Sequence, residues 1–402
     1  MIMKRVLLNA MASTAGGGTT YLQNVLPRLA GKSGKEIIPP DLFFHFLVPP
    51  EHLQGYLQFA GPRIIIETAP VSGGILSRWC WEQTRLRGYL REHQIDVLIS
   101  LGNFALFHSP VTQILFNRNA LYFSDDFKRD LISRKQYGML LGHLLKSRLA
   151  KASIRQADIN ATPTIAFANL ISEDRSLREC RFEVLPFGFD PSIFQAGDSN
   201  QDQDSAAKID LGENCCRVLY VSHYNYFRNF ETLIHSLPEM KKKIREMTGK
   251  RLQLLLTTDL KRGAVYGGYD STSAAEMIDR MGVRNDIVML GNVPYQKLHT
   301  IYRLADLFVC PSYAESFGHP LLEAMATGVP VVAANLPVHR EICEEAAIYF
   351  EVFDPADLAQ KCASLLSDAK LKASLKERGK NQAAKFTWDN HVNKLCELIE
   401  RC

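Results

Sequence analysis

Two sets of alternating strands and helices are predicted along this chain, and that alternation limits its fold more than any other feature. In the first set, short apolar strands are expected at residues 5–9, 43–48, 63–67, 96–100 and 113–116. A helix capped by Thr19 or Thr20 is expected to run through Leu29, and an amphipathic helix is expected near residues 81–92. Strands that alternate with helices pair in parallel, because each helix returns the chain to the start of the next strand.

The second set follows the same pattern, with strands expected at residues 217–222, 252–257, 287–290, 307–310 and 329–333. Helices are expected from about Asn229 and Ser273, and near Tyr295, Pro320 and Val338. The fold class is therefore α/β, with two Rossmann-like, doubly wound parallel-sheet domains. Ligands of such sheets bind beyond the carboxyl ends of the strands, so we expect the domains to face a central cleft that holds the substrates.

Chain length and one polar segment set the domain boundaries. The chain has 402 residues, which is too long for one ordinary core and fits two domains of about 150–200 residues each. Residues 195–208 are polar and lack aromatic side chains, as a linker does. We expect an N-terminal domain at residues 1–195, a linker at 196–208 and a C-terminal domain at 209–384.

Composition excludes several classes of protein. The charged fraction is 22% and the formal net charge is +4, which is too weakly basic to indicate nucleic acid as a partner. Nine cysteines are scattered without a Cys-x-x-Cys pair, which favours a reducing cytosol and argues against structural zinc, so we expect no metal. The apolar N-terminal stretch ends at Asn9 before a glycine loop, which is typical of a strand and not of a signal peptide. The sequence has no run of 18 apolar residues, so no membrane-spanning helix is expected. A cytoplasmic location is expected.

The segment that carries most functional information has a glutamate at each end, Glu315-Ser-Phe-Gly-His-Pro-Leu-Leu-Glu323. Its proline suits the first position of a helix, which places Glu315 in the preceding loop and Glu323 about one turn inside. The amides of Ser316, Phe317, Gly318 and His319 would then face outward at the positive end of the helix dipole, as in a phosphate site. The alternative is a solvated loop charge and an exposed helix charge.

With this segment, the chain resembles the retaining glycosyltransferase family 4, the group 1 glycosyltransferases of GT-B fold. The resemblance runs over residues 288–366 and includes Leu290-Gly291-Asn-Val-Pro, Tyr302-Arg-Leu-Ala-Asp306, Pro311-Ser312, the glutamate segment through residue 332, and Arg340-Glu341-Ile342. It implies an N-terminal acceptor-binding domain, a C-terminal domain that binds a nucleotide sugar, and a closing helix at residues 385–402 that crosses back to the N-terminal domain.

The resemblance also implies roles for single residues. Glu315 would contact the hydroxyls of the donor sugar, and Glu323 the ribose. Two cations of the family match His223 and Arg228, where they clamp the donor diphosphate. Arg228 has a planar fork suited to phosphate oxygens. His223 departs from the usual basic residue, and a histidine that merely caps a strand end is the alternative there.

The N-terminal domain carries weaker signals. Gly16, Gly17 and Gly18 follow the first strand, and by resemblance Gly17 and Gly18 meet the donor phosphate or the acceptor. The loop is not Gly-x-Gly-x-x-Gly, so a nicotinamide site is poorly supported. Many family members place a histidine at a strand end that matches residues 114–119, where this chain offers Arg118 or Asn119. We expect Asn119 to bind the transferred sugar, and polar residues that only end a strand are the alternative.

Residues 137–154 combine leucines at helical spacing with basic side chains. Such a helix fits the surface of an anionic membrane. The alternative is a core helix whose charges face solvent.

The predicted function is that of a metal-independent hexosyltransferase without a cofactor. Its donor is a nucleotide-diphosphate sugar, either a UDP- or a GDP-sugar, and its acceptor is a glycan or a lipid-linked saccharide. Arg228, Glu315 and His223 are the expected catalytic residues. Two alternatives stay open: a nucleotide-sugar epimerase on the same fold, and a non-catalytic nucleotide-sugar-binding protein.

Overall fold

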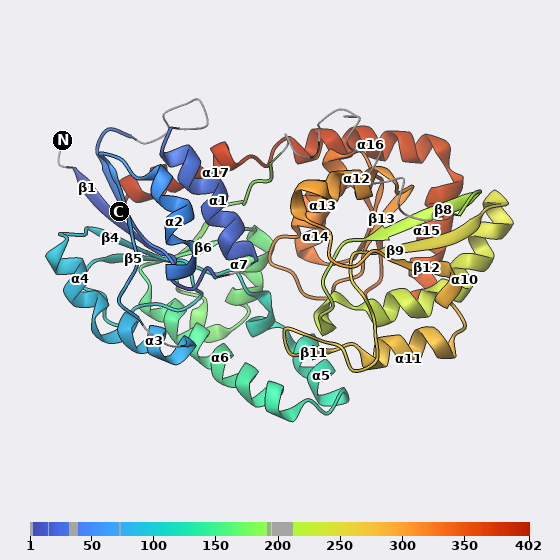
Figure 1. Ribbon diagram of the computed structural model, residues 1–402, viewed down its shortest axis with the longest axis horizontal. Helices are drawn as coiled ribbons and strands as arrows, with labels where there is room; N and C mark the ends of the chain where they lie inside the picture. The colour runs from blue at the N-terminus through green and yellow to red at the C-terminus, as the bar shows by residue number, and fades with distance from the viewer. Residues whose placement is uncertain (1–2, 15, 32–38, 72–73, 191–193, 195–211) are drawn as a thin grey trace. The chain divides into compact units, whose positions relative to one another are not determined.

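The computed structural model describes the chain except for residues 1–2, 15, 32–38, 72–73, 191–193 and 195–211 (Figure 1). The chain forms two compact units. The first contains residues 1–123, 135–188 and 387–402, and the second contains residues 124–134 and 189–386. The linker expected at residues 196–208 lies outside the described residues.

A seven-stranded parallel sheet forms the centre of the first unit, in the order β3-β2-β1-β4-β5-β6-β7. The five predicted strands are confirmed to within two residues, and β6 and β7 were not predicted. The strands are β1 (Lys4–Asn9), β2 (Leu42–Leu47), β3 (Ile64–Glu67), β4 (Val97–Ser100), β5 (Thr112–Phe116), β6 (Ile159–Thr162) and β7 (Phe182–Val184).

Helices pack on this sheet because its central strands are apolar on both faces, as parallel strands are. Val6, Leu7 and Leu8 of β1 are fully buried. The helices of the first unit are α1 (Gly17–Leu29), α2 (Leu53–Tyr56), α3 (Ile75–Thr84), α4 (Leu86–Glu92), α6 (Tyr137–Gln156), α7 (Ile165–Ser172) and the C-terminal α17 (Trp388–Glu400).

Helix α17 returns to the first unit and packs on α1, in blue and red in Figure 1. A ring nitrogen of His391 lies 3.0 Å from the hydroxyl of Tyr21, and Arg28 forms a 2.7 Å ion pair with Asp389. Because Gly188 lies against the backbone of Trp388, a Cβ there would come within 2.2 Å of the Trp388 nitrogen. These contacts hold the last helix against the first unit.

Two predictions about the first unit were wrong in detail. Helix α1 begins at Gly17, not at a threonine cap, because Gly16 takes a left-handed φ of 60° and ends the loop. The Thr20 hydroxyl donates instead to the Gly16 carbonyl at 3.3 Å. The single helix expected near residues 81–92 is two helices, α3 and α4, which meet at Arg85.

The second unit is built on a six-stranded parallel sheet in the order β12-β9-β8-β13-β14-β15. All five predicted strands are confirmed, and β15 was not predicted. The strands are β8 (Cys215–Tyr220), β9 (Arg251–Leu256), β12 (Ile287–Met289), β13 (Leu307–Cys310), β14 (Val331–Ala334) and β15 (Ala347–Phe350), beside a small hairpin of β10 (Val265–Tyr266) and β11 (Tyr269–Asp270).

The helices of the second unit are α10 (Phe230–Thr248), α11 (Thr272–Arg280), α12 (Leu298–Arg303), α13 (His319–Ala326), α14 (Pro337–Cys343), α15 (Pro355–Ser367) and α16 (Ala369–Ala383). Helix α5 (Asp125–Ser133) also belongs to this unit, although the sequence boundary assigns its residues to the N-terminal domain. Its Asp130 accepts a hydrogen bond of 2.7 Å from the Tyr313 hydroxyl.

Helix α6 carries several leucines on an exposed face. Leu141 is 62% exposed and Leu145 is 57% exposed, whereas Ser147, Ala150 and Ile154 are buried. The buried face and the exposed charges fit the alternative of a core helix, and the exposed leucines fit contact with a membrane, so both stay predictions. None of the described helices is long and apolar enough to cross a membrane.

Candidate active site

The loop between β13 and α13 shapes the predicted anion site. Helix α13 begins at His319 with Pro320 in its first turn, so Glu315 lies in the loop and Glu323 inside the helix, as predicted. Gly318 precedes the helix with φ 95° and ψ 53°, a left-handed conformation that glycine adopts without strain. A Cβ there would also come within 2.9 Å of the Leu321 side chain. The loop therefore requires glycine at this position.

Arg228 forms an ion pair with Glu315 at the mouth of this helix. Its guanidinium also lies 3.4 Å from the Ser312 hydroxyl and stacks over the Phe227 ring at 4.9 Å. Only 24% of the Arg228 side chain and 10% of the Glu315 side chain are exposed. Two opposite charges so shielded from water depend on each other, because either one alone would carry a large desolvation cost.

The backbone around Arg228 is fixed by buried hydrogen bonds. Asn229 takes a left-handed φ of 55° and donates to the Pro311 carbonyl at 3.0 Å. The Tyr220 hydroxyl donates to the Arg228 carbonyl at 2.8 Å. The arginine is thus held at the carboxyl end of β13, where ligands of parallel sheets bind.

Glu323 is 5% exposed, and its carboxylate accepts a hydrogen bond of 2.9 Å from the Tyr302 hydroxyl. Burial raises the pKa of Glu323 to about 7, although the Tyr302 hydrogen bond acts in the opposite direction. The alternative of an exposed helix charge is therefore wrong. A carboxylate that is buried away from water must have a structural or functional role, because burial disfavours its charged form.

Beneath Glu315 lies a group of possible metal ligands. The ligand atoms of Cys310, Glu315 and His339 lie within 4.8 Å of one another. Burial lowers the pKa of His339 to about 4, and its Nδ1 lies 2.8 Å from the Ala334 carbonyl, so the neutral ring presents Nε2 to the Cys310 thiol at 3.8 Å. Arg228 already supplies a cation to Glu315, so this arrangement does not favour a metal ion there.

His223 lies in the loop after β8, and its side chain is exposed. Its carbonyl accepts a 2.9 Å hydrogen bond from the Ser222 hydroxyl. Among the described contacts, Glu315 pairs with Arg228 and does not contact His223. The structure thus brings together Arg228, Glu315 and the Ser316–His319 loop, and leaves His223 outside this group. Its proposed clamp role stays a prediction.

In the first unit, the glycine loop lies against Arg118. A Cβ on Gly17 would come within 3.2 Å of the Arg118 guanidinium, and one on Gly18 would come within 2.8 Å of Ser13. Asn119 uses its side-chain oxygen to accept from the Leu121 amide at 3.1 Å. Arg118 is therefore the side chain that the fold places at the glycine loop, and Asn119 shapes a turn. Which of them binds a sugar stays a prediction.

A pocket of about 500 Å³ opens in the second unit beside the Arg228 loop. Arg134 crosses it, with ion pairs of 2.7 Å to Asp130 and 2.9 Å to Glu231. This pocket could not be predicted from the sequence, because α5 and α10, which both line it, lie about a hundred positions apart. The pocket is lined by Asp126, Arg129, Asp130, Ser133, Arg134, Asn229, Glu231, Thr232, His235, Tyr313 and Phe353.

Residues 201–382 match the model of the family described as glycosyl transferases group 1. The family resemblance seen in the motifs is confirmed. The chain is 29% identical over 227 residues to the D-inositol 3-phosphate glycosyltransferase of Corynebacterium efficiens, which covers 54% of this chain and 50% of that protein. It is 33% identical over 125 residues to the O-antigen chain mannosyltransferase B of Escherichia coli, covering 31% and 33% of the two chains. The chain thus spans about half the length of the D-inositol 3-phosphate glycosyltransferases that it matches.

Solved structures extend the likeness to the whole fold. A glycosyltransferase from Rickettsia africae aligns over 99% of this chain and 98% of its own, with a TM-score of 0.71 and 14% identity. The Anabaena protein Alr3699/HepE, solved in complex with UDP and glucose, aligns over all of both chains with a TM-score of 0.70 and 18% identity. Identities this low establish the fold alone. The two parallel-sheet domains of the GT-B class are confirmed.

Proposed function

We propose that this protein is a retaining glycosyltransferase that moves a hexose from a nucleotide-diphosphate sugar to a saccharide or lipid-linked saccharide acceptor. The observation that carries the proposal is the shielded ion pair of Arg228 and Glu315 at the N-terminus of α13. A cation, a carboxylate and helix amides at one place suit a diphosphate that is joined to a sugar.

Donor binding is proposed to exchange the partners of this ion pair. Arg228 turns from Glu315 to the diphosphate, where its fork fits two phosphate oxygens. Glu315, released from the arginine, then accepts hydrogen bonds from hydroxyls of the sugar. Because both groups are already desolvated, the exchange loses little hydration, and each new contact replaces a charge contact that was present before.

The transfer step is proposed to depend on electrostatic stabilisation. The bond between the anomeric carbon and the diphosphate oxygen breaks, and a bond to the acceptor oxygen forms on the same face. The acceptor proton passes to the departing diphosphate. Arg228 and the amides of residues 316–319 stabilise the negative charge that develops on that leaving group. In the same proposal, Glu323 binds the ribose of the nucleotide.

The donor carries uridine or guanosine in this proposal. The Anabaena neighbour was solved with UDP and with UDP-glucose, which supports a nucleotide-sugar donor. The relatives named above act on an inositol phosphate and on an O-antigen chain according to their names, which supports a hydroxyl-bearing acceptor. No cofactor is part of the proposed reaction.

Contact with an anionic membrane is proposed for α6, since a lipid-linked acceptor would be presented there. Its exposed leucines, Leu141 and Leu145, stand beside the exposed basic residues Lys146 and Arg148. Leucine side chains can enter the acyl boundary while lysine and arginine reach anionic headgroups.

A thermal-shift screen of the full chain against UDP- and GDP-sugars tests the proposal. A donor that binds the folded protein raises its melting temperature. Arg228→Lys is expected to weaken the shift, because an ammonium group lacks the bidentate fork. Arg280→Lys is the matched control, on the exposed end of α11. Equal shifts in wild type and Arg228→Lys contradict the donor site.

Incubation with donor and without acceptor separates the remaining alternatives. A transferase leaves the donor intact or hydrolyses it slowly, whereas formation of an epimer would favour the epimerase alternative. Donor binding with no transfer to any saccharide and no hydrolysis would favour a binding protein.

A further inference from the structure

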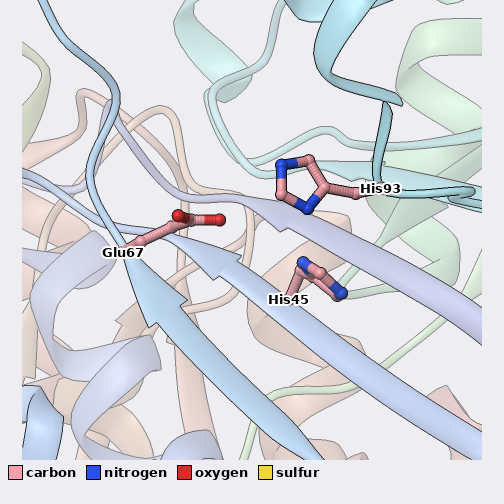
Figure 2. A group of neighbouring side chains, drawn as sticks. All are labelled: His45, Glu67 and His93. Carbon is pink, nitrogen blue, oxygen red and sulfur yellow. The ribbon is translucent and has the colours of Figure 1, made fainter. Parts of the chain in front are cut away.

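Three side chains of types that can bind a metal ion meet in the first unit, on a face of the sheet (Figure 2). His45 lies on β2, Glu67 is the last residue of β3, and His93 follows α4 directly. Each offers one ligand atom, and these atoms lie within 4.8 Å of one another. Two imidazoles and a carboxylate are a ligand set that zinc accepts, with an open position for water.

The fold brings these three residues together from distant places in the sequence. In the parallel pair of β2 and β3, His45 lies opposite Ile65, so Glu67 points to the same face two residues further on. Helix α4 covers this face, because Leu86 and Leu90 pack in one cluster with Leu7 and Leu47. The end of α4 therefore delivers His93 above His45, and the two rings lie 5.3 Å apart.

His45 is the member whose state demands an explanation. It is 1% exposed, and neither ring nitrogen has a hydrogen-bond partner among the described residues. A buried polar group without a partner costs about 1–3 kcal/mol, and such groups are rare in folded proteins. A neutral imidazole with a free lone pair is the form that binds a metal ion.

The other two ligands are held by neighbouring groups. The Tyr89 hydroxyl donates to one oxygen of Glu67, and the Tyr89 ring stacks on His93 at 4.1 Å. Such outer contacts orient ligands in metal sites. Arg5 lies nearby, with its guanidinium 3.3 Å from the His93 carbonyl, and its charge opposes a cation. Glu67 carries the opposite charge directly at the site.

We propose that His45, Glu67 and His93 bind one divalent ion of the zinc class, with water as a further ligand. Zinc bonds of about 2.0–2.2 Å place tetrahedral ligands about 3.4 Å apart, so the three side chains close in by roughly 1 Å when the ion enters. The ion joins α4 to β2 and β3.

The expectation of no metal rested on the absence of short ligand spacings, and these ligands come from three separate elements.

The test uses the full chain after treatment with a chelator. Calorimetric titration with Zn²⁺ is expected to show one site that is lost in the double variant His45→Gln/His93→Gln. The matched control is His108→Gln, because His108 is exposed in the same unit and its hydrogen bond to Gln156 is made by its backbone amide. If the double variant fails to fold, the single variant His93→Gln replaces it, because residue 93 is only half-buried. This single variant is expected to weaken Zn²⁺ binding at least tenfold.

A second readout excludes the cysteines as ligands. Co²⁺ bound at this site is expected to give visible d–d bands without the intense near-ultraviolet band that thiolate ligands produce. Failure of the wild type to bind Zn²⁺ overturns the proposal. It is also overturned if His93→Gln binds as the wild type does, or if Co²⁺ shows thiolate ligation. None of these outcomes bears on the proposed donor contacts of Arg228 and Glu315, which lie in the second unit.

Discussion

Glu323 gives the stability of the second unit a dependence on pH that one substitution removes. Burial raises the pKa of this carboxyl from 4.5 to about 7. Between these two values the folded protein holds a proton that the unfolded chain has released. Stability therefore falls as the pH rises through this range, and it is constant above it. Raising a pKa by this amount costs the ionised form about 3 kcal/mol.

The substitution Glu323→Gln keeps an oxygen that accepts from Tyr302 but has no charge to lose. Its free energy of unfolding should not follow this part of the pH dependence. The difference in free energy of unfolding between the variant and wild type should therefore rise by about 2–3 kcal/mol from pH 5 to pH 8, in favour of the variant. The matched control is Glu276→Gln on the exposed side of α11, whose difference from wild type should stay constant.

Hydrogen exchange of the α13 and β13 amides is the appropriate assay. The three tryptophans are Trp79, Trp81 and Trp388, which all belong to the first unit, so their fluorescence reports on the wrong part of the chain. A chain of two units also need not unfold in one step. If the difference between Glu323→Gln and wild type is the same at pH 5 and pH 8, Glu323 ionises normally and the reasoning from its burial is refuted.

Three further predictions follow from packing and charge. Arg134→Met leaves two carboxylates without their cation and should destabilise the second unit by about 3 kcal/mol, measured at pH 7 by urea unfolding followed through hydrogen exchange of second-unit amides; a loss below 1 kcal/mol contradicts the ion-pair network. Gly318→Ala should cost about 1–3 kcal/mol in the same assay, because its left-handed backbone and the space near Leu321 exclude a methyl group; an unchanged midpoint contradicts it. Sedimentation with anionic vesicles should show binding that weakens at high salt and is lost in Leu141→Ser/Leu145→Ser; binding that ignores both changes rules out α6.

The sequence predicted most strands of both sheets because they are short apolar runs between helices. Strands β6 and β7 were missed because Asn160, Thr162 and Glu183 interrupt their apolar pattern. Their pairing partners are supplied by the sheet, which local sequence does not reveal. The same limit applies to α5, whose place in the second unit depends on Asp130 and its contact with Tyr313.

The candidate site was predictable where one segment carries several of its residues. Glu315, Gly318 and Glu323 lie on one loop and helix, so their spacing fixes their geometry. The pairing of Arg228 with Glu315 was not predicted, because only the order of strands β8 and β13 brings them together. The burial of Glu323 was missed for a similar reason, since it depends on Tyr302 from another helix.

Glu315 and the donor diphosphate compete for Arg228 in the proposed donor site, and this competition gives its most direct test. The measurement is calorimetric binding of UDP or GDP, with and without the attached sugar, to wild type, Arg228→Met and Glu315→Gln. We predict that Arg228→Met loses affinity for both ligands. Glu315→Gln should bind the bare nucleotide at least as tightly as wild type, because the arginine is released, but should lose the gain that the sugar provides. If both variants bind both ligands as wild type does, the ion pair is not the donor site.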